Sequence, residues 1–598
     1  MPFVTDTDLA AIGVAQGANM VGFIQSQAGA VARSAMDKMR DVVSVADFGP
    51  AGTSDDRARI QAALNTGKSV YLPSGAYRIS ATVATTAPGQ RVYGDGRDTS
   101  LVCDGTNVQA TCIAILHENC TVENISLVPG TTVAHQVEGY GVAIIGAAHC
   151  AVRDVQVSHF RRGGVLLDNS DHCIVSGNTF RDSVVVPSPS LPQSETGCDV
   201  LMLGTSSHNI VEGNQCVSGC GVGVACQTGT AGASQFGNVI RGNICSGHPC
   251  YGIMVYLSDP DASIDDVIIE GNEIEDISGT IFANGTALFY GAGIYIQTSR
   301  RFIVSNNSVR RTNTDRSLPR TGSDTPAAIG ISGRTAGTIC GNVVMDAYYG
   351  IMVSQAVNAD DAGNGVVITG NVVRPDPTNT RRLIMGIYVI DTANAIISNN
   401  DVVGSNNIDT TRCIFVHKAS PSVDINSIDI SNNRCATAYT LIETTGSGQR
   451  TRIVGNTVCD ATNYGIYATF ADANVSHNNI YEVSNGIGFP ASVLRGICSK
   501  NLIVASLASI NSSSAPGVYR RGNRFSTGAI QGIATLANGT AVVSSTEIRS
   551  GDVVMLSRQA AGGTLGDLSI ASIVNGTSFS VKSSSTGESS TVAYEIIH

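Results

Sequence analysis

The most restrictive feature of this 598-residue chain is a short pattern that returns at intervals of 22 to 36 residues. An apolar residue is followed by two residues, the second usually Gly or Asn, and then by Asn, any residue and another apolar residue, as in Ile269–Ile274 and Ile368–Val373. Self-similarity on this scale is the signature of a repeat architecture. The thirteen asparagines of the pattern are Asn178, Asn214, Asn243, Asn272, Asn307, Asn342, Asn371, Asn400, Asn433, Asn456, Asn478, Asn501 and Asn523.

This repeat predicts a parallel β-helix. The shortest intervals, 22 and 23 residues, suit a coil of three short strands. Apolar residues at a fixed phase would point inward and stack between coils about 4.8 Å apart. Gly or Asn at the bend would tolerate the left-handed backbone of a tight turn. Leucine-rich repeats need more leucine, and a β-propeller needs a period near 40. We therefore expect an all-β chain built around a right-handed, single-stranded parallel β-helix.

Composition and charge exclude several other classes of protein. Charged residues make up 14% and hydrophobic residues 42% of the chain, which is the opposite of a disordered composition. The net charge of −11 argues against nucleic-acid binding. No apolar run reaches the roughly 18 residues of a membrane span, and the first thirty residues carry no secretion pattern. We therefore expect that the protein is synthesised in a cytoplasm and does not insert into a membrane. We expect the 16 cysteines to act as small buried apolar residues.

The interval lengths indicate where function lies. From Asn433 to Asn523 the coils are minimal, whereas from Asn178 to Asn433 they carry up to about a dozen extra residues each. Loops grafted on a rigid solenoid usually build its binding face. The predicted loops are Val185–Gly197, Thr228–Phe236, Leu257–Asp266, Ser278–Gly291, Thr312–Ala327, Gln355–Gly365 and Pro375–Arg382.

A second recurring strand begins with Gly and alternates inward and outward residues, as in Gly293–Ile296 and Gly386–Val389. An outward row of aromatic side chains could stack sugar rings, or it could be buried between subunits, and both interpretations stay open. The expected outward residues are Met254, Tyr295, Met352, Tyr388, Phe415 and Tyr467.

Carboxylates at the third and fourth positions after the repeat asparagine are the candidate catalytic groups. Stacking of the coils would place Glu275 beside Arg310 and Asp276 beside Arg311, with Asp346 one coil further. Residues two coils apart are separated by about 9.6 Å, which is compatible with an inverting glycosidase pair. A solvated ladder of opposite charges is the simpler alternative. Asp199, Glu273 and the acids at 259–266 also compete, but no calcium-loop pattern is present and we predict no metal and no cofactor.

A concentration of arginine suggests an anionic ligand. Residues 300–382 hold ten Arg, no Lys and six Asp, a local charge of +4. A glycan with acidic sugars would permit a second reaction, β-elimination by a lyase, which needs a cation and a base. Arg310, Arg311 and Arg374 could bind the carboxylate, with His248 or Tyr295 as base; a structural role for His248 at a coil bend fits equally well. An esterase is disfavoured, because no Gly-x-Ser-x-Gly elbow is present.

Both ends of the chain resemble known families. Asp41–Gly49, Ile60–Leu64, Val70–Ile79 and Tyr93–Gly96 resemble the opening segment of pectate-lyase-like β-helix proteins, with an N-capped helix at about Asp55–Asn65 that would plug the end of the solenoid. The loop after Phe48 lacks the second Gly-Asp-Gly usual in that segment. Gly17–Ile24 and Gly29–Arg40 resemble the anchor of bacteriophage tailspikes. Gly532–Thr540, Gly562–Asp567 and Tyr594–Ile597 resemble the small β-sandwich that ends phage tail fibres and spikes.

The resemblance implies a homotrimeric tailspike that binds and endo-cleaves a bacterial O-antigen or capsule. It would be a virion protein attached to the tail baseplate through its N-terminal segment, and an endoglycosidase is the first expectation. A polysaccharide lyase and a non-catalytic adhesin are the alternatives. The expected domains are an anchor at 1–40, a cap at 41–110, the β-helix at 111–527 and a trimerising β-sandwich at 528–598.

Overall fold

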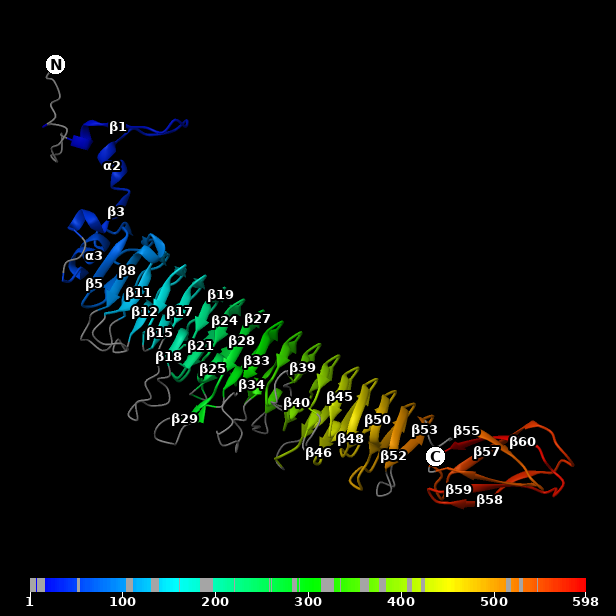
Figure 1. Ribbon diagram of the computed structural model, residues 1–598. Helices are drawn as coiled ribbons and strands as arrows, with labels where there is room; N and C mark the ends of the chain where they lie inside the picture. Colours follow the sequence, from blue (N-terminus) through cyan, green and yellow to red (C-terminus); the bar gives the residue numbers. More distant parts are fainter. Residues whose placement is uncertain are drawn as a thin grey trace. The chain divides into compact units, whose positions relative to one another are not determined.

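A computed structural model gives the fold (Figure 1). The chain forms two compact units, Met1–Val267 with Ile281–Phe289, and Ile268–Thr280 with Tyr290–His598. The structure describes residues 7, 17–50, 54–103, 111–130, 139–160, 162–182, 197–219, 221–257, 259, 261–281, 288–289, 291–312, 327–333, 335–354, 365–375, 383–405, 411–420, 425–511, 518–525, 531–545 and 547–597.

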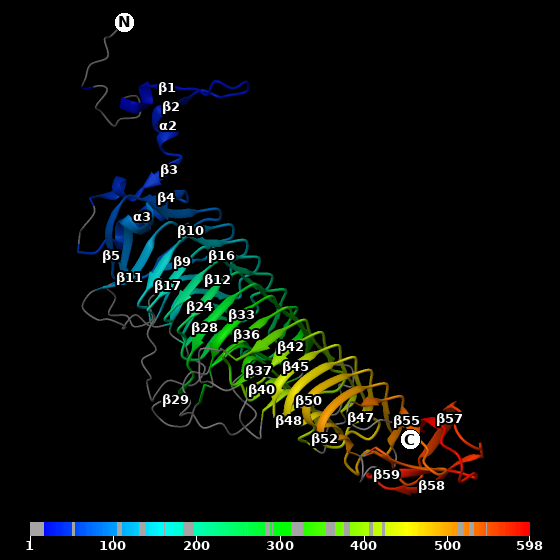
Figure 2. The same cartoon turned by 45° about the vertical axis from the view of Figure 1, so that its right-hand side comes forward.

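The first unit is a parallel β-helix with three rows of strands, one strand of each row per coil (Figure 2). The strands before the bend form the first row: β3 (Val42–Ser44), β4 (Ser69–Leu72), β7 (Arg91–Gly94), β10 (Thr121–Glu123), β13 (Ala151–Arg153), β16 (Ile174–Ser176), β19 (Ile210–Glu212) and β23 (Val239–Arg241). The second row is β5 (Gly75–Ile79), β8 (Thr99–Cys103), β11 (Ser126–Pro129), β14 (Gln156–Ser158), β17 (Thr179–Arg181), β20 (Gln215–Val217) and β24 (Ile244–Ser246). The third row is β6 (Val83–Ala84), β9 (Ile113–Ile115), β12 (Tyr140–Ile145), β15 (Gly163–Asp168), β18 (Gly197–Leu203), β21 (Gly221–Thr228) and β25 (Tyr251–Leu257). Two further strands, β22 (Ser234–Phe236) and β26 (Ser263–Asp265), pair parallel within segments predicted as loops.

The second unit is also built of three rows of parallel strands. Its first row is β27 (Ile268–Glu270), β32 (Arg300–Ser305), β35 (Ala336–Cys340), β38 (Val366–Thr369), β41 (Ile396–Ser398), β44 (Asn426–Ser431), β47 (Gln449–Val454), β49 (Asn474–Ser476), β51 (Gly496–Ser499) and β53 (Val518–Arg521). The second row is β28 (Glu273–Ile277), β33 (Ser308–Thr312), β36 (Val343–Met345), β39 (Val372–Arg374), β42 (Asp401–Val403) and β45 (Arg434–Ala438). The third is β31 (Ala292–Gln297), β34 (Ala327–Ser332), β37 (Tyr349–Ser354), β40 (Met385–Ile390), β43 (Arg412–His417) and β46 (Thr440–Thr445). In the minimal coils the last two rows merge into the long strands β48 (Thr457–Ala468), β50 (Asn479–Gly488) and β52 (Leu502–Asn511), followed by β54 (Arg524–Phe525). The short strands β29 (Thr280–Ile281) and β30 (Leu288–Phe289) lie between β28 and β31 in the sequence.

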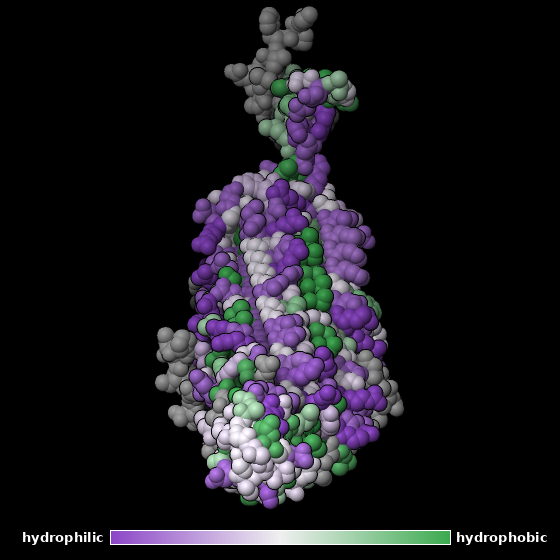
Figure 3. Space-filling model, turned by 90° about the vertical axis from the view of Figure 1, so that its right-hand side faces the viewer, coloured by the Kyte–Doolittle hydropathy of each residue, from purple (hydrophilic) through white to green (hydrophobic). Residues whose placement is uncertain are grey.

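Apolar side chains at equal positions of successive coils build the interior. In the first row of the second unit, Val304, Ile339, Ile368, Ile397 and Ile430 stack in register and are fully buried. A buried side chain of this size stabilises the fold by about 1.5–3 kcal/mol. Because each coil repeats the same positions, side chains of one kind form rows along the solenoid, seen as coloured stripes in Figure 3.

The repeat asparagines form a buried hydrogen-bonded ladder rather than the bend itself. Asn371 Nδ2 donates to Asn400 Oδ1 at 3.0 Å and to the Ile339 carbonyl at 3.0 Å. Its own Oδ1 accepts from Asn342, both from the backbone N–H and from Nδ2. The left-handed backbone predicted at the bend belongs to the residue before each asparagine, such as Gly370 or Asn399. The predicted left-handed bend at Gly or Asn is therefore confirmed at the position before the repeat asparagine.

A short helix near the N-terminus packs against the first coils. Helix α3 (Arg57–Leu64) lies where the sequence predicted one, and Ile60, Ala63 and Leu64 are fully buried. The Asp55 carboxylate accepts the Arg57 N–H at 3.0 Å at its start. The remaining elements are η1 (Gly17–Met20), β1 (Gly22–Phe23), β2 (Arg33–Ser34), α2 (Ala35–Met39), η2 (Val45–Phe48) and η3 (Gly96–Asp98). No helix among the residues placed by the structure is long and apolar enough to cross a membrane.

The C-terminal residues form a β-sandwich of two antiparallel sheets. One sheet has the order β55 (Gln531–Thr535), β60 (Thr591–Ile597), β57 (Val553–Ala560), and the other β56 (Thr540–Ser544), β59 (Ser578–Ser583), β58 (Leu568–Val574). Phe579 and Tyr594 pack edge to face between them, with ring centroids 5.1 Å apart. Tyr594 also covers the cross-strand Gly532, where a Cβ would lie 2.5 Å from the tyrosine oxygen.

The cysteines depart in one place from the prediction that they are buried apolar residues. Cys103 and Cys112 form a disulfide, with their Cα atoms 6.3 Å apart. Most of the free cysteines that the structure describes are buried, as the alternation of the strands predicted.

Candidate functional site

An aromatic cluster lies on the outer face of the third row of the second unit. Tyr349, Tyr388, Phe415 and His417 come from β37, β40 and β43, three successive coils. The Tyr388 and Phe415 rings stack at 5.1 Å and 9°, and Phe415 stacks on His417 at 5.3 Å. Tyr349 lies 6.2 Å from Tyr388, and Tyr348 meets Tyr349 edge-on. The parallel register produces this stack, because it sets Tyr388 directly beside Phe415.

Polar groups are held within this aromatic cluster. The Tyr388 hydroxyl and His417 Nδ1 are hydrogen-bonded at 3.1 Å. Burial raises the pKa of Tyr388 to about 12, so the phenol is neutral at physiological pH. The Arg412 guanidinium lies 5.0 Å from the centre of the Phe415 ring, a cation–π contact, and its Nε donates to Glu443 at 2.6 Å. The cluster thus combines flat apolar faces with hydrogen-bonding groups, which is what a saccharide requires.

The predicted outward aromatic row is real only over part of its length. In the second unit it reads Tyr295, Gly330, Met352, Tyr388, Phe415, Glu443 and Tyr467. Gly330 and Glu443 interrupt it, and Met352 and Phe415 are buried, at 2% and 8% exposed. Tyr295 is half-buried and its hydroxyl is bonded to Ser332 Oγ at 2.9 Å. Met254, in the first unit, is also buried.

The predicted carboxylates lie in an ion-pair cluster on β28 and β33. Glu275 pairs in register with Arg310, as predicted. It forms an ion pair with Arg310 Nε at 2.9 Å and accepts a hydrogen bond from Arg311 Nη2 at 2.7 Å. Asp276 holds Arg311 through two hydrogen bonds of 2.7 and 3.0 Å. Glu273 pairs with Arg310. These contacts are those of the opposite-charge ladder, the simpler of the two interpretations.

Asp346 is not available beside them as a second surface carboxylate. It is only 2% exposed. Asp276, Arg311 and Asp346 each take a left-handed backbone conformation, with φ of 57°, 51° and 54°. The position four after the repeat asparagine therefore takes a left-handed bend, within β28 and β33 and directly after β36, and Asp tolerates such a bend. The sequence predicted an exposed pair of carboxylates, Glu275 or Asp276 with Asp346. This prediction is wrong, because Asp346 is buried.

The expected basic patch is corrected for three of its arginines, which have acidic partners. Arg310, Arg311 and Arg374 are paired with Glu273, Glu275, Asp276 and Asp401, all of which lie outside residues 300–382. Asp401 also binds Arg434 at 2.8 Å. A charge count over residues 300–382 missed these partners, because the preceding or the following coil supplies them. Arg316, Arg320, Arg334, Arg381 and Arg382 lie outside the described residues.

His248 cannot contact a glycan, because it is fully buried in the first unit. Its Nε2 donates to the Cys216 carbonyl at 3.2 Å and lies 3.6 Å from an Asp199 oxygen. Gly219 packs on the imidazole, since a Cβ there would come within 2.1 Å of Cε1. Burial lowers the pKa of His248 to about 4, which keeps it neutral. Of its two predicted roles, the structural one fits.

Residues of the aromatic cluster were partly missed from the sequence. Tyr388 was predicted, whereas Tyr349, Arg412, His417 and Glu443 were not. Strand alternation could have revealed His417, because it lies two residues after the outward Phe415. Arg412 and Glu443 carry no such signal. Among residues with described positions, no group of three or more His, Cys, Asp or Glu could hold a metal ion. The predicted loops Val185–Gly197, Thr312–Ala327, Gln355–Gly365 and Pro375–Arg382 fall mostly outside the described residues.

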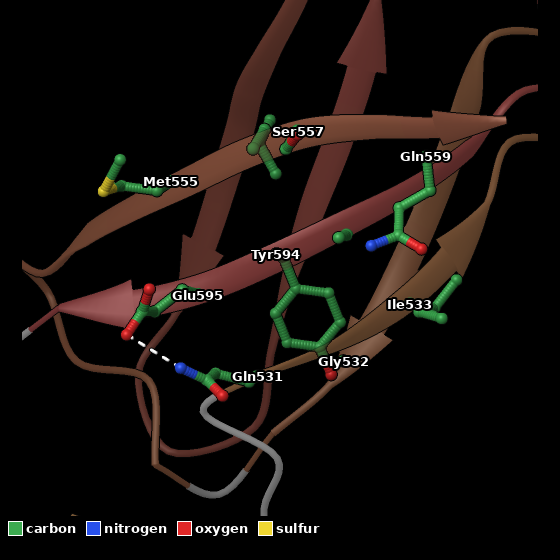
Figure 4. Close-up of a pocket in the computed structure, with 10 residues that line it drawn as sticks. Gln531, Gly532, Ile533, Met555, Ser557, Gln559, Tyr594 and Glu595 are labelled. Atoms are coloured by element: carbon green, nitrogen blue, oxygen red, sulfur yellow. Dashed lines mark hydrogen bonds between the residues drawn. The ribbon is translucent and has the colours of Figure 1, made fainter. Parts of the chain in front are cut away.

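A separate hollow of about 480 Å³ lies on the C-terminal domain (Figure 4). It is open and lies over the sheet β55–β60–β57, lined by Ile533, Met555, Ser557, Gln559 and Ala593 among others. Gln531 Nε2 donates to Glu595 at 2.8 Å at one end. Ile533 and Met555 are 62% and 56% exposed, so this face carries uncovered apolar side chains among polar ones such as Gln559 and Glu595.

Comparisons with known proteins agree with this architecture. Residues 99–274 match the right-handed β-helix family, which confirms the predicted fold class. Residues 528–597 match the C-terminal domain of K1 capsule-specific polysaccharide lyase. No curated protein sequence matches the chain significantly.

Solved structures with similar folds include two groups of proteins. The tailspike protein of Escherichia coli bacteriophage HK620, in complex with a pentasaccharide, is 13% identical over 97% of both chains, with a TM-score of 0.42. A variant of it with a hexasaccharide is 14% identical over 97% of this chain and 98% of that chain, with a TM-score of 0.45. The catalytic unit of a GH87 α-1,3-glucanase from Streptomyces thermodiastaticus is 15% identical over 76% of this chain and 67% of that chain, with a TM-score of 0.42.

Proposed function

We propose that this protein is a phage tailspike that binds and cleaves a bacterial surface polysaccharide, a capsule or an O-antigen. The observation that carries the proposal is the aromatic cluster on the third strand row. Tyr349 and Tyr388 are partly exposed rings, and Arg412 and His417, also partly exposed, add hydrogen-bonding groups beside them. The match of residues 528–597 to a capsule lyase domain supports a polysaccharide as the ligand.

Apolar surfaces at both ends support assembly into a virion. Ile533 and Met555 expose one face of the C-terminal sheet, and we propose that this face packs between the subunits of a homotrimer. Near the N-terminus, Ile24, Val31 and Met39 are exposed, and helix α2 buries none of its residues. We propose that this segment attaches the protein to the tail baseplate.

The proposal is tested with purified full-length protein on lawns of capsulated and O-antigen-bearing strains. We expect a cleared zone on a strain whose polysaccharide the protein recognises. Polysaccharide purified from that strain is then incubated with protein, and its length and reducing ends are followed. Shortened chains with new reducing ends support the proposal.

Two results would contradict it. Tight binding without any shortening would make the protein an adhesin. No clearing and no binding on every strain of a broad panel would contradict polysaccharide recognition altogether.

Tyr388→Ala, compared with Tyr519→Ala on the exposed face of β53, shows whether the aromatic cluster is the binding surface.

A further inference from the structure

We infer that Tyr464 and Tyr467 form a second sugar-binding surface, the tyrosine platform, which makes the protein bind long glycan chains more tightly than short ones. The inference rests on the proposed function and deepens it, because it adds a separate subsite to the binding surface of the aromatic cluster. Its starting point is the pair of tyrosine rings on β48, whose centroids are 5.0 Å apart and whose planes are tilted by 37°.

The parallel register places this pair on the same outward row as the aromatic cluster. Along β40, β43, β46 and β48 the row reads Tyr388, Phe415, Glu443 and Tyr467. Each step between neighbouring strands is about 4.8 Å, so Tyr388 and Tyr467 are separated by about 14 Å along the solenoid. A chain of several sugars that follows the row can therefore contact both tyrosines, whereas a short oligosaccharide cannot.

The next coil supports both rings of the platform. Gly488 of β50 lies in register with Tyr467, and a Cβ at Gly488 would come within 2.6 Å of the Tyr467 ring and 2.7 Å of the Tyr464 ring. The rings therefore pack on the backbone of β50, where no side chain intervenes. Both tyrosines are nevertheless partly exposed. A ring that is already held in place loses little conformational freedom when a sugar stacks on it, which favours binding.

Amide side chains lie beside the rings. Asn485 is in register with Tyr464, Asn463 precedes Tyr464 in the sequence, and both asparagines are partly exposed. Asn463 Nδ2 donates to Thr440 Oγ1 at 3.4 Å, and Asn485 Nδ2 donates to the Asn463 carbonyl at 3.3 Å. Among the described residues, neither side-chain oxygen accepts a hydrogen bond. These oxygens can accept from sugar hydroxyls while the apolar face of the sugar stacks on a tyrosine.

The platform lies on coils without added loops. Asn433, Asn456 and Asn478 follow one another at intervals of 23 and 22 residues, which is the length of a minimal coil. The surface around Tyr464 and Tyr467 is therefore built from strands and tight bends, without the long loops that would enclose a chain end. Such an open surface suits the interior of a long polysaccharide.

Two contacts on one chain explain a preference for length. When a glycan is held at the aromatic cluster, its binding at the tyrosine platform becomes an intramolecular step with a high effective concentration. The gain is available only to chains that reach both places. The platform should therefore affect KM for long chains and leave kcat unchanged, because it does not contact the bond that is cleaved.

The test uses the full-length protein and the polysaccharide of the strain that it clears. KM and kcat are measured on long chains and on the shortest oligosaccharides that the parent protein still cleaves. Tyr464→Ala combined with Tyr467→Ala should raise KM for long chains roughly tenfold, with KM for the short oligosaccharides and both kcat values within about twofold of the parent.

Two further variants serve as controls. Tyr464→Phe combined with Tyr467→Phe keeps both rings and should retain the parent KM for long chains. Tyr519→Ala removes an exposed ring from β53 and should leave every KM unchanged. If the double alanine variant does not fold, Tyr467→Val replaces it, because a branched side chain suits a strand, and the same direction of change is expected.

The outcomes separate the platform from the proposed function. An unchanged KM for long chains in a folded variant would overturn the platform and leave the proposed function standing. An equal rise of KM for long and short chains would also overturn it, because the pair would then act as part of the aromatic cluster. Failure to bind every polysaccharide of the panel would overturn the proposed function, and the platform with it.

Discussion

At the scale of single residues, the ion pairs of the charged side chains are made with residues of the neighbouring coil. Glu275 and Asp276 looked like catalytic carboxylates because they follow a repeat asparagine at outward positions. The next coil brings Arg310 and Arg311 against them at hydrogen-bond distance. Both carboxylates therefore belong to a ladder of opposite charges between neighbouring strands.

Glu275→Gln therefore should leave glycan cleavage within about twofold of the parent protein. It should cost no more than about 1 kcal/mol of stability, because partly exposed ion pairs contribute little. Cleavage assays and thermal unfolding check this, with Glu212→Gln, which breaks the Arg241 pair in the first unit, as the matched control. Lost cleavage in a variant of unchanged melting temperature would restore the carboxylate mechanism.

His248 makes the first unit sensitive to acid. Burial holds its pKa at about 4, whereas the unfolded chain has an ordinary histidine pKa of about 6.5. Between these values the unfolded chain binds the proton more readily, so stability falls as the pH falls through that range.

His248→Asn should remove this part of the pH dependence, although it lowers stability at neutral pH. The exposed His477→Asn should keep it. Denaturant unfolding followed by circular dichroism at several pH values distinguishes the two variants. An equal pH dependence in the parent protein and in His248→Asn would show that another group is responsible.

At the scale of the strand and its turn, the asparagine ladder joins the coils. Asn342, for example, donates its amide to Asn371 and to the Val304 carbonyl, and its oxygen accepts from Asn307. Buried amides without such partners would cost stability. The preceding residue supplies the left-handed bend, which is why Gly and Asn recur there.

Asn371→Ala should destabilise the second unit by about 3 kcal/mol, because at least two buried groups lose a partner at about 1–3 kcal/mol each. Asn479→Ala, at an exposed position on β50, should change stability by less than about 0.5 kcal/mol. Equilibrium unfolding of both variants measures the difference. Equal effects would mean that the ladder contributes no more than a surface amide.

At the scale of the whole molecule, the exposed apolar faces point to assembly. The sandwich core closes over Phe579 and Tyr594, but Ile533, Val553 and Met555 on the outer side of its sheet remain largely exposed. A large apolar patch on a soluble protein marks an interaction surface.

The double variant Ile533→Glu with Met555→Glu should convert the proposed trimer to monomers without unfolding the sandwich. Sedimentation velocity gives the oligomeric state and circular dichroism the fold. Ser572→Glu, at an exposed position of the opposite sheet, should remain trimeric. A parent protein that sediments as a monomer would contradict the trimer itself.

The fold was accessible from the sequence, because it depends on local periodicity. An apolar residue two positions after each asparagine, a bend residue before it, and the alternating third strand such as Gly386–Val389 define three strands and their inward sides. Helix α3 was predicted for the same reason, since its signals lie within a few residues of one another.

The candidate site could be read from the sequence only in part. Tyr388 was found because alternation placed it outward. Its contact with His417, the burial of Asp346 and His248, and the neutralisation of Arg310 and Arg374 depend on residues about one coil away. Intervals of 22 to 36 residues separate such neighbours, so a contact across coils shifts with every loop length. Short-range patterns therefore specify the strands, whereas folding into coils determines which charges meet and which side chains are buried.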